Sequence, residues 1–337
     1  MPWYDLPLEQ LREYRTSTAE PEGLDEWWAG RLATARELAK PVTLTRHEPG
    51  LYGPVEVYDT EFSGANGDRI KAWYITPGHG TVDTIVVTFI GYGGGRGAPA
   101  EHILLPALGY AVLVMDTRGQ GGRWTFGATG DSAVGGGAVG GGAAGSSGPE
   151  NSLVMTRGVI SPETYYYTRL FTDAALAVDA ARELVGADGT IAVTGGSQGG
   201  GLSLAAAAFN PGEVAVCQPD VPFLCDIQRA ITLAPSAPYT EIPEFLSHNV
   251  SLIDATLNTL RYVDCALLAR RVTAPTLVSV SLMDPIVPPS TVFAAYNEIT
   301  ADKDIAVYPF SGHDVPRAHV ERKLAHLREL MPARPIA

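Results

Sequence analysis

The segment from residue 195 to residue 199, Gly-Gly-Ser-Gln-Gly, carries the best candidate for a nucleophile, Ser197. An apolar run at 190–194 precedes it and predicts a strand, and the small residues after it predict a helix. G-x-S-x-G in this context is typical of a sharp strand-to-helix turn that projects a serine oxygen above a sheet. The helix N-terminus at that point favours developing negative charge. The chemistry indicated is nucleophilic catalysis by a serine.

Two other interpretations of these glycines are weaker. The first is a glycine-rich turn in which the serine is incidental, although the strand and helix around it favour the nucleophile. The second is a dinucleotide-binding loop, but Gly195, Gly196 and Gly199 do not form G-x-G-x-x-G. They also lie late in the chain rather than in the first strand–helix unit.

A serine hydroxyl needs a neutral histidine to take its proton and a carboxylate to orient that histidine. In hydrolases of this kind the acid and then the histidine follow the serine in the chain. Asp284 follows the apolar run 275–281, and His313 follows the run 304–308. Each could instead be an ordinary loop residue, Asp284 as a turn aspartate before proline. Three such residues in the right order at successive strand ends favour a Ser197–His313–Asp284 triad.

The remaining histidines and acids fit the base and acid roles less well. Asp314 adjoins His313, and adjacent loop side chains usually diverge, so we do not expect it to orient the imidazole. His319 and His326 lie seven residues apart on an expected terminal helix and are expected on its solvated surface. The other candidates precede the serine, lie in an expected insertion or lack a strand-end position: His47, His79, His102, His248, Asp254, Asp264 and Asp304.

A tetrahedral intermediate also needs hydrogen-bond donors for its oxygen. One donor is expected to be the backbone N–H of Gln198, the residue after the nucleophile. The second is expected from the glycine-rich loop 90–97, where Tyr92 is the best-placed residue and its ring could narrow the acyl pocket. The alternative is a flexible loop that carries a surface tyrosine.

Short apolar runs alternating with helical patterns must position these groups. Strands are expected at 55–61, 69–75, 84–90, 110–115, 190–194, 213–217, 275–281 and 304–308, and helices at 163–184, after 197 and at 317–330. The pattern predicts an α/β fold with a mostly parallel, doubly wound sheet, preceded by an antiparallel hairpin. We expect a single domain over 1–337, with a helical extension at 1–50 and an inserted lid at 224–268.

Composition narrows the partners. The chain has 337 residues and a formal net charge of 24 − 37 = −13, which disfavours nucleic acid and anionic membranes as partners. We see no apolar run of the roughly 18 residues that a membrane span needs and no secretory signal. Three scattered cysteines favour buried thiols and a reducing cytoplasm over disulfides or a metal site. The glycine-rich stretch 130–148 is expected to be a flexible linker. The chemistry requires no cofactor.

With these residues placed, the chain resembles carbohydrate esterase family 7, the acetyl xylan esterases and cephalosporin C deacetylases, which have the α/β-hydrolase fold. The resemblance runs from about Trp3 to the terminal helix, through segments 93–97, 115–121, 155–158, 164–167, 195–201, 220–225 and 288–297. It implies the triad above, Tyr92 and Gln198 as oxyanion donors, and Arg118 and Gln120 as braces of the site. It also implies acetylated xylo-oligosaccharides, other short acyl esters and cephalosporin C as substrates, and a homohexamer.

Two positions depart from the family pattern. Ile90 stands where the family usually has histidine, and Asp314 stands where it usually has glutamate. Neither change removes a catalytic group, so they bear on substrate preference. An oligopeptidase-like hydrolase is a rival, but such enzymes generally carry a β-propeller for which the first 50 residues leave no room. A non-catalytic binding module is a second rival, although such relatives typically lack the serine or the histidine.

Overall fold

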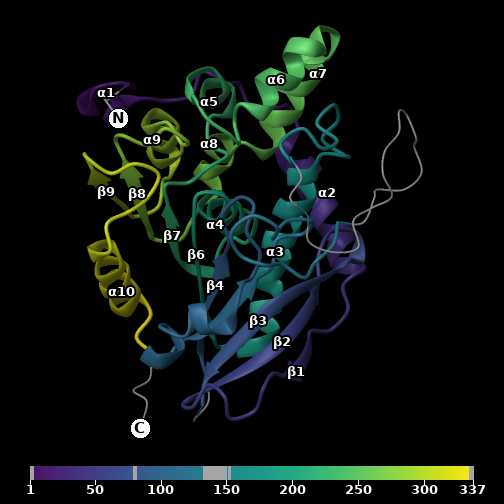
Figure 1. The fold of residues 1–337 in the computed structure, drawn as a ribbon, viewed down its shortest axis with the longest axis vertical. Coiled ribbons are helices and arrows are strands. Elements are labelled where there is room, and N and C mark those ends of the chain that lie inside the picture. The colour runs from purple at the N-terminus through teal and green to yellow at the C-terminus, as the bar shows by residue number, and fades with distance from the viewer. Residues whose placement is uncertain (1–3, 79–81, 132–149, 151–152, 334–337) are drawn as a thin grey trace.

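The computed structural model describes residues 4–78, 82–131, 150 and 153–333. The strands of this part of the chain form one twisted sheet in the order β1-β2-β3-β5-β4-β6-β7-β8-β9 (Figure 1). The strands are β1 (Thr43–Arg46), β2 (Val55–Ser63), β3 (Arg69–Pro77), β4 (Thr84–Phe89), β5 (Ala111–Met115), β6 (Thr190–Gly196), β7 (Val214–Asp220), β8 (Thr276–Ser281) and β9 (Lys303–Tyr308).

Strand direction divides this sheet into two parts. The pairs β1–β2, β2–β3 and β3–β5 are antiparallel, so the expected hairpin of β2 and β3 is confirmed. All pairs from β5 through β4, β6, β7 and β8 to β9 are parallel. Parallel strands need crossovers, and their carboxyl ends share one edge of the sheet. The predicted α/β-hydrolase fold is therefore confirmed, and it places the loops after β4, β6, β8 and β9 at one edge.

The first strand was not predicted from the sequence. β1 lies inside the segment 1–50, for which only helices were expected, so that expectation was wrong at residues 43–46. All four residues of β1 are exposed, and within the described part of the chain β1 pairs with β2 alone. A short edge strand with both faces in water shows no apolar alternation, so its sequence carries no signal of a strand.

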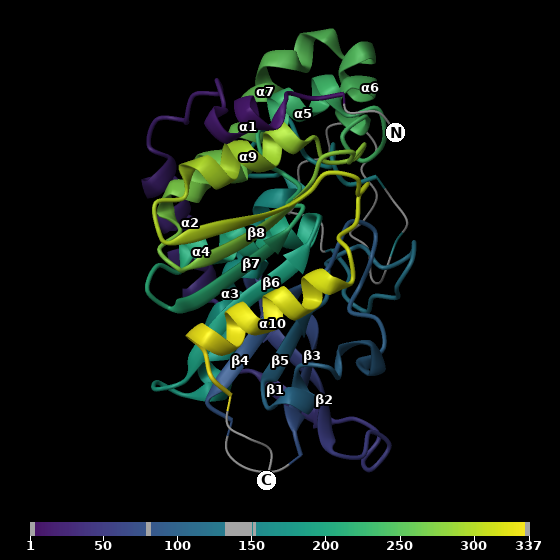
Figure 2. The same cartoon turned by 90° about the vertical axis from the view of Figure 1, so that its left-hand side faces the viewer.

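Helices cover both faces of the sheet, with α3 and α4 on one face and α10 across the other (Figure 2). Among the described residues, no helix is both long and apolar enough to cross a bilayer. The helices are α1 (Leu8–Glu13), α2 (Leu24–Glu37), α3 (Tyr166–Val185), α4 (Gln198–Phe209), α5 (Ile227–Leu233), α6 (Glu241–His248), α7 (Ile253–Leu260), α8 (Cys265–Leu268), α9 (Pro289–Glu298) and α10 (Ala318–Leu330).

The central strands are apolar along their whole length because both faces are buried. In β4, Val86 packs in a cluster with Leu327 of α10, whereas Ile85 and Val87 belong to the main core on the other face. Successive strand residues point to opposite faces, so a strand covered on both sides needs an apolar residue at nearly every position. This requirement explains the continuous apolar runs seen in the sequence.

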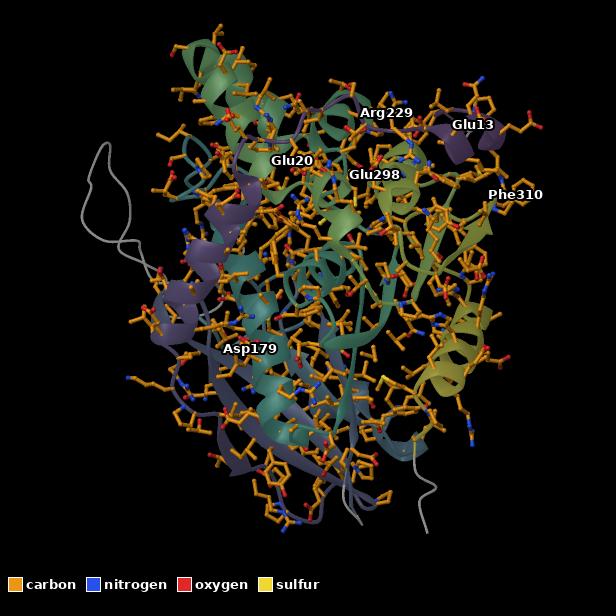
Figure 3. All side chains as sticks on the ribbon, turned by 180° about the vertical axis from the view of Figure 1, so that it is seen from behind. Glu13, Glu20, Asp179, Arg229, Glu298 and Phe310 are labelled. Carbon is orange, nitrogen blue, oxygen red and sulfur yellow. The ribbon has the colours of Figure 1, made fainter. Side chains whose placement is uncertain are left out.

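The N-terminal residues run along one side of the molecule and are held there by ion pairs. Arg229, Glu298 and Asp179, labelled in Figure 3, pair with Asp5, Arg15 and Arg36 respectively. Trp28 of α2 is buried and its indole donates to a backbone carbonyl at residue 262. The extension is therefore packed onto the α/β core.

The segment 224–268 connects β7 to β8 and contains α5, α6, α7 and α8. Figure 1 shows α6 and α7 projecting from one end of the molecule. Ala237 and Pro238, between α5 and α6, line a cavity described below. The glycine-rich stretch expected to be a linker falls outside the described residues from position 132 onward.

All three cysteines are unpaired and buried: Cys217 lies in β7, Cys225 precedes α5, and Cys265 begins α8. Each is 0% exposed, so they pack as small apolar side chains, as expected from the sequence. Burial raises the pKa of the Cys217 and Cys225 thiols above the ordinary value. Neither of these two thiols is therefore a nucleophile near neutral pH.

Candidate active site

Ser197 occupies the sharp turn between β6 and α4. Its backbone has φ 58° and ψ −119°, a strained conformation for a residue with a side chain. The neighbouring glycines make the turn possible, since a Cβ on Gly199 would lie 2.3 Å from the carbonyl oxygen of Phe89. A Cβ on Gly195 would lie 2.5 Å from the carbonyl oxygen of Gly199. The turn therefore requires glycine at these two positions, as the sequence motif indicates.

The loops after β8 and β9 bring the acid and the histidine to this serine. His313 Nε2 lies 2.9 Å from Ser197 Oγ, and His313 Nδ1 lies 2.7 Å from Asp284 Oδ2. Both distances are within hydrogen-bonding range. The structure thus brings together three residues that the sequence separates by 87 and 29 positions (284 − 197 and 313 − 284). The carboxylate can hold a proton on Nδ1, which leaves Nε2 free to accept one from the serine.

The loop around Asp284 holds its carboxylate in one orientation. Its second oxygen, Oδ1, accepts hydrogen bonds from the backbone N–H groups of Ile286 and Val287, at 2.8 and 2.9 Å. The hydroxyl of Tyr4 donates to the Asp284 carbonyl at 2.5 Å. The Asp284 side chain is 1% exposed, whereas the His313 side chain is 21% exposed. The acid is therefore buried beneath a histidine that reaches the surface.

Ser197 and His313 open into a cavity of about 510 Å³. Ile90 and Asp314, the two positions that depart from the family pattern, also line it. The other lining residues come from the end of β4 and the loop after it, the segment 123–124, the ends of β6 and β7, the insertion, and the loops after β8 and β9: Phe89, Gly91, Tyr92, Arg123, Trp124, Gly196, Asp220, Val221, Ala237, Pro238, Ile286 and Val315. A cavity of this size can hold a small ester.

Hydrogen bonds from two glutamines connect the predicted oxyanion loop to helix α4. Gln198 Nε2 donates to the Ile90 carbonyl at 3.2 Å, and Gln198 Oε1 accepts from Gln120 Nε2 at 3.0 Å. Gln120 Oε1 in turn accepts from the Gly93 N–H at 2.6 Å. The structure therefore brings Gln120, Gln198 and the loop that carries Tyr92 together directly behind the cavity. Such bonds can hold main-chain donors in place during a reaction.

Arg118 lies outside the cavity wall, in a buried cluster of charges. Its guanidinium bonds both oxygens of Asp173, at 2.5 and 2.7 Å, and also pairs with Asp68 and Asp131. Burial alone would lower the pKa of Arg118, but these carboxylates raise it above the ordinary value. The Arg118 carbonyl accepts from Tyr166, and the hydroxyl of Tyr166 also accepts from Gln120. Among the residues that the structure describes, Arg118 is thus linked to the site through Tyr166 and Gln120 rather than by a direct hydrogen bond.

Replacing Arg118 by leucine is expected to lower the free energy of unfolding by about 3–5 kcal/mol, because the buried carboxylate of Asp173 loses its counter-charge. Urea denaturation followed by circular dichroism measures this. Arg46→Leu is the matched control, since Arg46 pairs with Glu56 at the surface and should contribute at most about 1 kcal/mol. Equal losses in the two variants would contradict a structural role for the buried cluster.

The expected surface position of His319 is wrong. Its side chain is fully buried, with Nε2 2.7 Å from Asp220 Oδ1 and Nδ1 2.8 Å from the Tyr308 hydroxyl. His326 is half-buried, and its Nδ1 accepts from Gln218. Helical spacing places both residues on the face of α10 that packs against β7. Polar side chains of the sheet form hydrogen bonds with both imidazoles.

Sequence reasoning missed two acids near the catalytic residues: Asp220 lines the cavity, and Glu241 bonds the lining residue Tyr92. Asp220 ends β7, and its backbone carbonyl accepts the Ser197 N–H at 2.9 Å. Burial alone would raise its pKa, but Lys323 and His319 hold that pKa below the ordinary value. Its strand-end position was the available signal. Glu241, at the start of α6, bonds the Tyr92 hydroxyl at 2.7 Å, and the sequence offers no comparable signal for it.

The parallel sheet, the strained serine turn and the Ser–His–Asp chain of hydrogen bonds define an α/β-hydrolase. Within that class, the chain belongs to the acetyl xylan esterase (AXE1) family, whose model matches residues 1–330.

Solved structures of two acetyl xylan esterases are similar over nearly the whole chain. The acetyl xylan esterase from Paenibacillus sp. R4 is 33% identical with a TM-score of 0.84, and the match covers 97% of this chain and 100% of that one. Acetyl xylan esterase 1 from Thermoanaerobacterium sp. JW/SL YS485 is also 33% identical over the same shares, with a TM-score of 0.82.

A curated relative matches over a shorter region. The acetyl esterase Axe7A of Xylanibacter ruminicola is 30% identical over 160 residues, which is 47% of this chain. The match spans about a third of that relative's own length, 35%.

Proposed function

We propose that this protein is a serine esterase that removes acetyl groups from acetylated xylo-oligosaccharides and other short-chain acyl esters, including cephalosporin C. The observation that carries the proposal is the hydrogen-bonded series Ser197–His313–Asp284 at the wall of an open cavity. Family membership supports acetyl esters as the substrate class, because the similar solved structures are described as acetyl xylan esterases.

In the acylation step, His313 Nε2 takes the proton of Ser197 as Oγ attacks the ester carbonyl carbon. Asp284 stabilises the imidazolium that forms. The negative charge on the carbonyl oxygen is stabilised by the backbone N–H groups of Gln198 and Tyr92. The bond to the alcohol oxygen then breaks, and His313 returns its proton to that oxygen. The sugar alcohol leaves, and the acetyl group remains on Ser197.

In the deacylation step, water replaces the alcohol. His313 takes a proton from the water as its oxygen attacks the acetyl carbonyl. The second tetrahedral intermediate uses the same oxyanion donors, and its collapse breaks the bond to Ser197 Oγ. His313 gives the proton back to the serine, and acetate leaves. No cofactor takes part in either step.

A panel of esters on the purified protein tests the proposal. We expect kcat/KM to be highest for p-nitrophenyl acetate and to fall at least about tenfold by the octanoate, because each extra methylene must fit a pocket narrowed by Tyr92. Acetate should also be released from acetylated xylo-oligosaccharides and from cephalosporin C. The matched amide, p-nitroacetanilide, should turn over far more slowly. Faster cleavage of the amide or of the octanoate would contradict the proposal.

Four further expectations belong to this proposal. The chain is a single domain over 1–337. Segment 224–268 acts as a lid over the cavity, and the position of Ala237 and Pro238 in the cavity lining supports this role. The family resemblance supports a homohexamer, which light scattering after gel filtration tests. The three buried, unpaired thiols support a cytoplasmic location.

A further inference from the structure

We propose that Glu241, the first residue of α6 in the insertion, is a positioning residue for the oxyanion site. It acts by holding Tyr92, whose backbone N–H is one of the two expected oxyanion donors. This inference rests on the esterase function proposed above and adds to it a connection between the insertion and the reaction.

The contacts of Glu241 show what it holds. Its Oε1 accepts from the Tyr92 hydroxyl at 2.7 Å, and its Oε2 accepts from the Met155 N–H at 3.2 Å. The Tyr92 hydroxyl also accepts from the Val154 N–H at 3.1 Å. The carboxylate therefore joins three separate parts of the chain, namely the loop after β4, the segment before α3, and α6. Each of its two oxygens accepts a hydrogen bond, which a glutamine could not reproduce because its amide has a single acceptor oxygen.

Burying this carboxylate costs free energy of folding, which argues that it has a role beyond keeping the protein soluble. Glu241 is 6% exposed, and its hydrogen-bond partners are a phenol and a peptide N–H, both neutral groups, while Arg123 is a cation near enough to act on it without a hydrogen bond. Burial raises the pKa of Glu241, whereas its hydrogen bonds to Tyr92 and Met155 lower it. Burial outweighs these partners and Arg123, since the pKa stays above the ordinary value; carboxyl groups whose pKa is shifted by burial cluster at functional sites.

Tyr92 is the point at which this anchoring reaches the reaction. Its carbonyl accepts from the Trp124 indole N–H at 2.9 Å, and the next N–H, that of Gly93, donates to Gln120. These bonds fix the peptide after Tyr92. The peptide before it carries the oxyanion donor, and it follows Gly91, which alone would leave that peptide free to rotate. Anchoring the side chain through Glu241 fixes the Cβ position, so the direction of the Tyr92 N–H is set.

Two single substitutions test the inference. In Glu241→Gln the amide can accept from Met155, but its NH₂ group then faces the Tyr92 hydroxyl, whose own proton is left without an acceptor. Tyr92→Phe removes the same hydrogen bond from the other side, together with the bond from the Val154 N–H. We expect each variant to lower kcat for p-nitrophenyl acetate by about tenfold to a hundredfold with KM within about twofold, because a misaligned donor acts in the transition state.

A tetrahedral inhibitor separates positioning from a general loss of structure. Methylboronic acid forms a tetrahedral adduct on a serine, and its inhibition constant should weaken by about the same factor as kcat in both variants. The double variant should be no worse than the poorer single variant, because both substitutions break the same Glu241–Tyr92 hydrogen bond. Glu244→Gln is the matched control: it removes the same charge from an exposed position on α6 and should leave kcat unchanged.

The outcomes distinguish this inference from the proposed function. An active wild-type protein whose Glu241→Gln and Tyr92→Phe variants keep their kcat would overturn the role of Glu241 alone. So would losses that multiply in the double variant, or boronate binding that does not change. If Glu241→Gln fails to fold, a Tyr92→Phe variant that keeps its kcat still overturns the inference. A wild-type protein that does not hydrolyse acetyl esters would instead overturn the proposed function.

Discussion

Replacing Ser197 by alanine is expected to lower kcat for p-nitrophenyl acetate by at least about 10³-fold, with little change in KM. The variant loses the oxygen that forms the acyl-enzyme, while the cavity and the oxyanion donors remain. The activity left should be that of water attack assisted by those donors. Steady-state kinetics measures this loss, and a fluorophosphonate probe should label the wild-type protein but not the variant.

Ser203→Ala is the matched control for this variant. Ser203 lies on the same helix, α4, and its buried hydroxyl donates to the Gly199 carbonyl at 2.8 Å. That bond is local to the helix, so its loss should leave kcat within about twofold, as expected for a substitution that touches no reacting group. If the Ser197→Ala protein kept near-full activity, or if the probe labelled it as the wild type, Ser197 would not be the nucleophile.

Asp284→Asn is expected to lower kcat by about 10³- to 10⁴-fold, because it imposes the wrong histidine tautomer. The asparagine oxygen can still accept from the N–H groups of Ile286 and Val287, so the loop should keep its shape. Its NH₂ group then faces His313 Nδ1, which must become an acceptor. The imidazole proton then lies on Nε2 and points at Ser197. Nε2 can therefore no longer accept the proton of the serine hydroxyl. Kinetics at neutral pH measures the loss, and an unchanged melting temperature shows that the fold survives.

Asp314→Asn controls for the loss of one negative charge near the same histidine. Asp314 is exposed and lines the cavity, but no hydrogen bond joins its side chain to His313 among the contacts that the structure gives. We expect its kcat to stay within about tenfold of the wild type, since it removes a nearby charge and no orienting bond. A larger loss from Asp314→Asn than from Asp284→Asn would reverse the assignment of the acid.

The sequence predicts those parts of this molecule that obey local rules. Ser197 stands out because a sharp turn demands glycine around it, and the clash that a Cβ on Gly199 would make shows the physical reason. Asp284 and His313 stand out because parallel strands end at a common edge, so position along the chain translates into position in space. The apolar runs of the central strands follow from burial on both faces.

Features that depend on contacts between distant segments could not be predicted in this way. His319 was expected in water because the sequence of a helix does not reveal which of its faces packs against the sheet. Its partner Asp220 is 99 residues away. Glu241 bonds Tyr92 across 149 residues, and an acid at the start of a helix is an ordinary cap by sequence alone. β1 is a strand only because β2 offers it hydrogen bonds.

The packing of all three thiols in the interior has a practical consequence for work with this protein. Reagents that react with exposed sulfur, such as maleimides, should find no target on the folded native chain, since every cysteine is 0% exposed. A single cysteine introduced at the surface would then be the sole point of attachment for a dye or a solid support. Immobilised or fluorescent forms can therefore be made without replacing any native residue of the core.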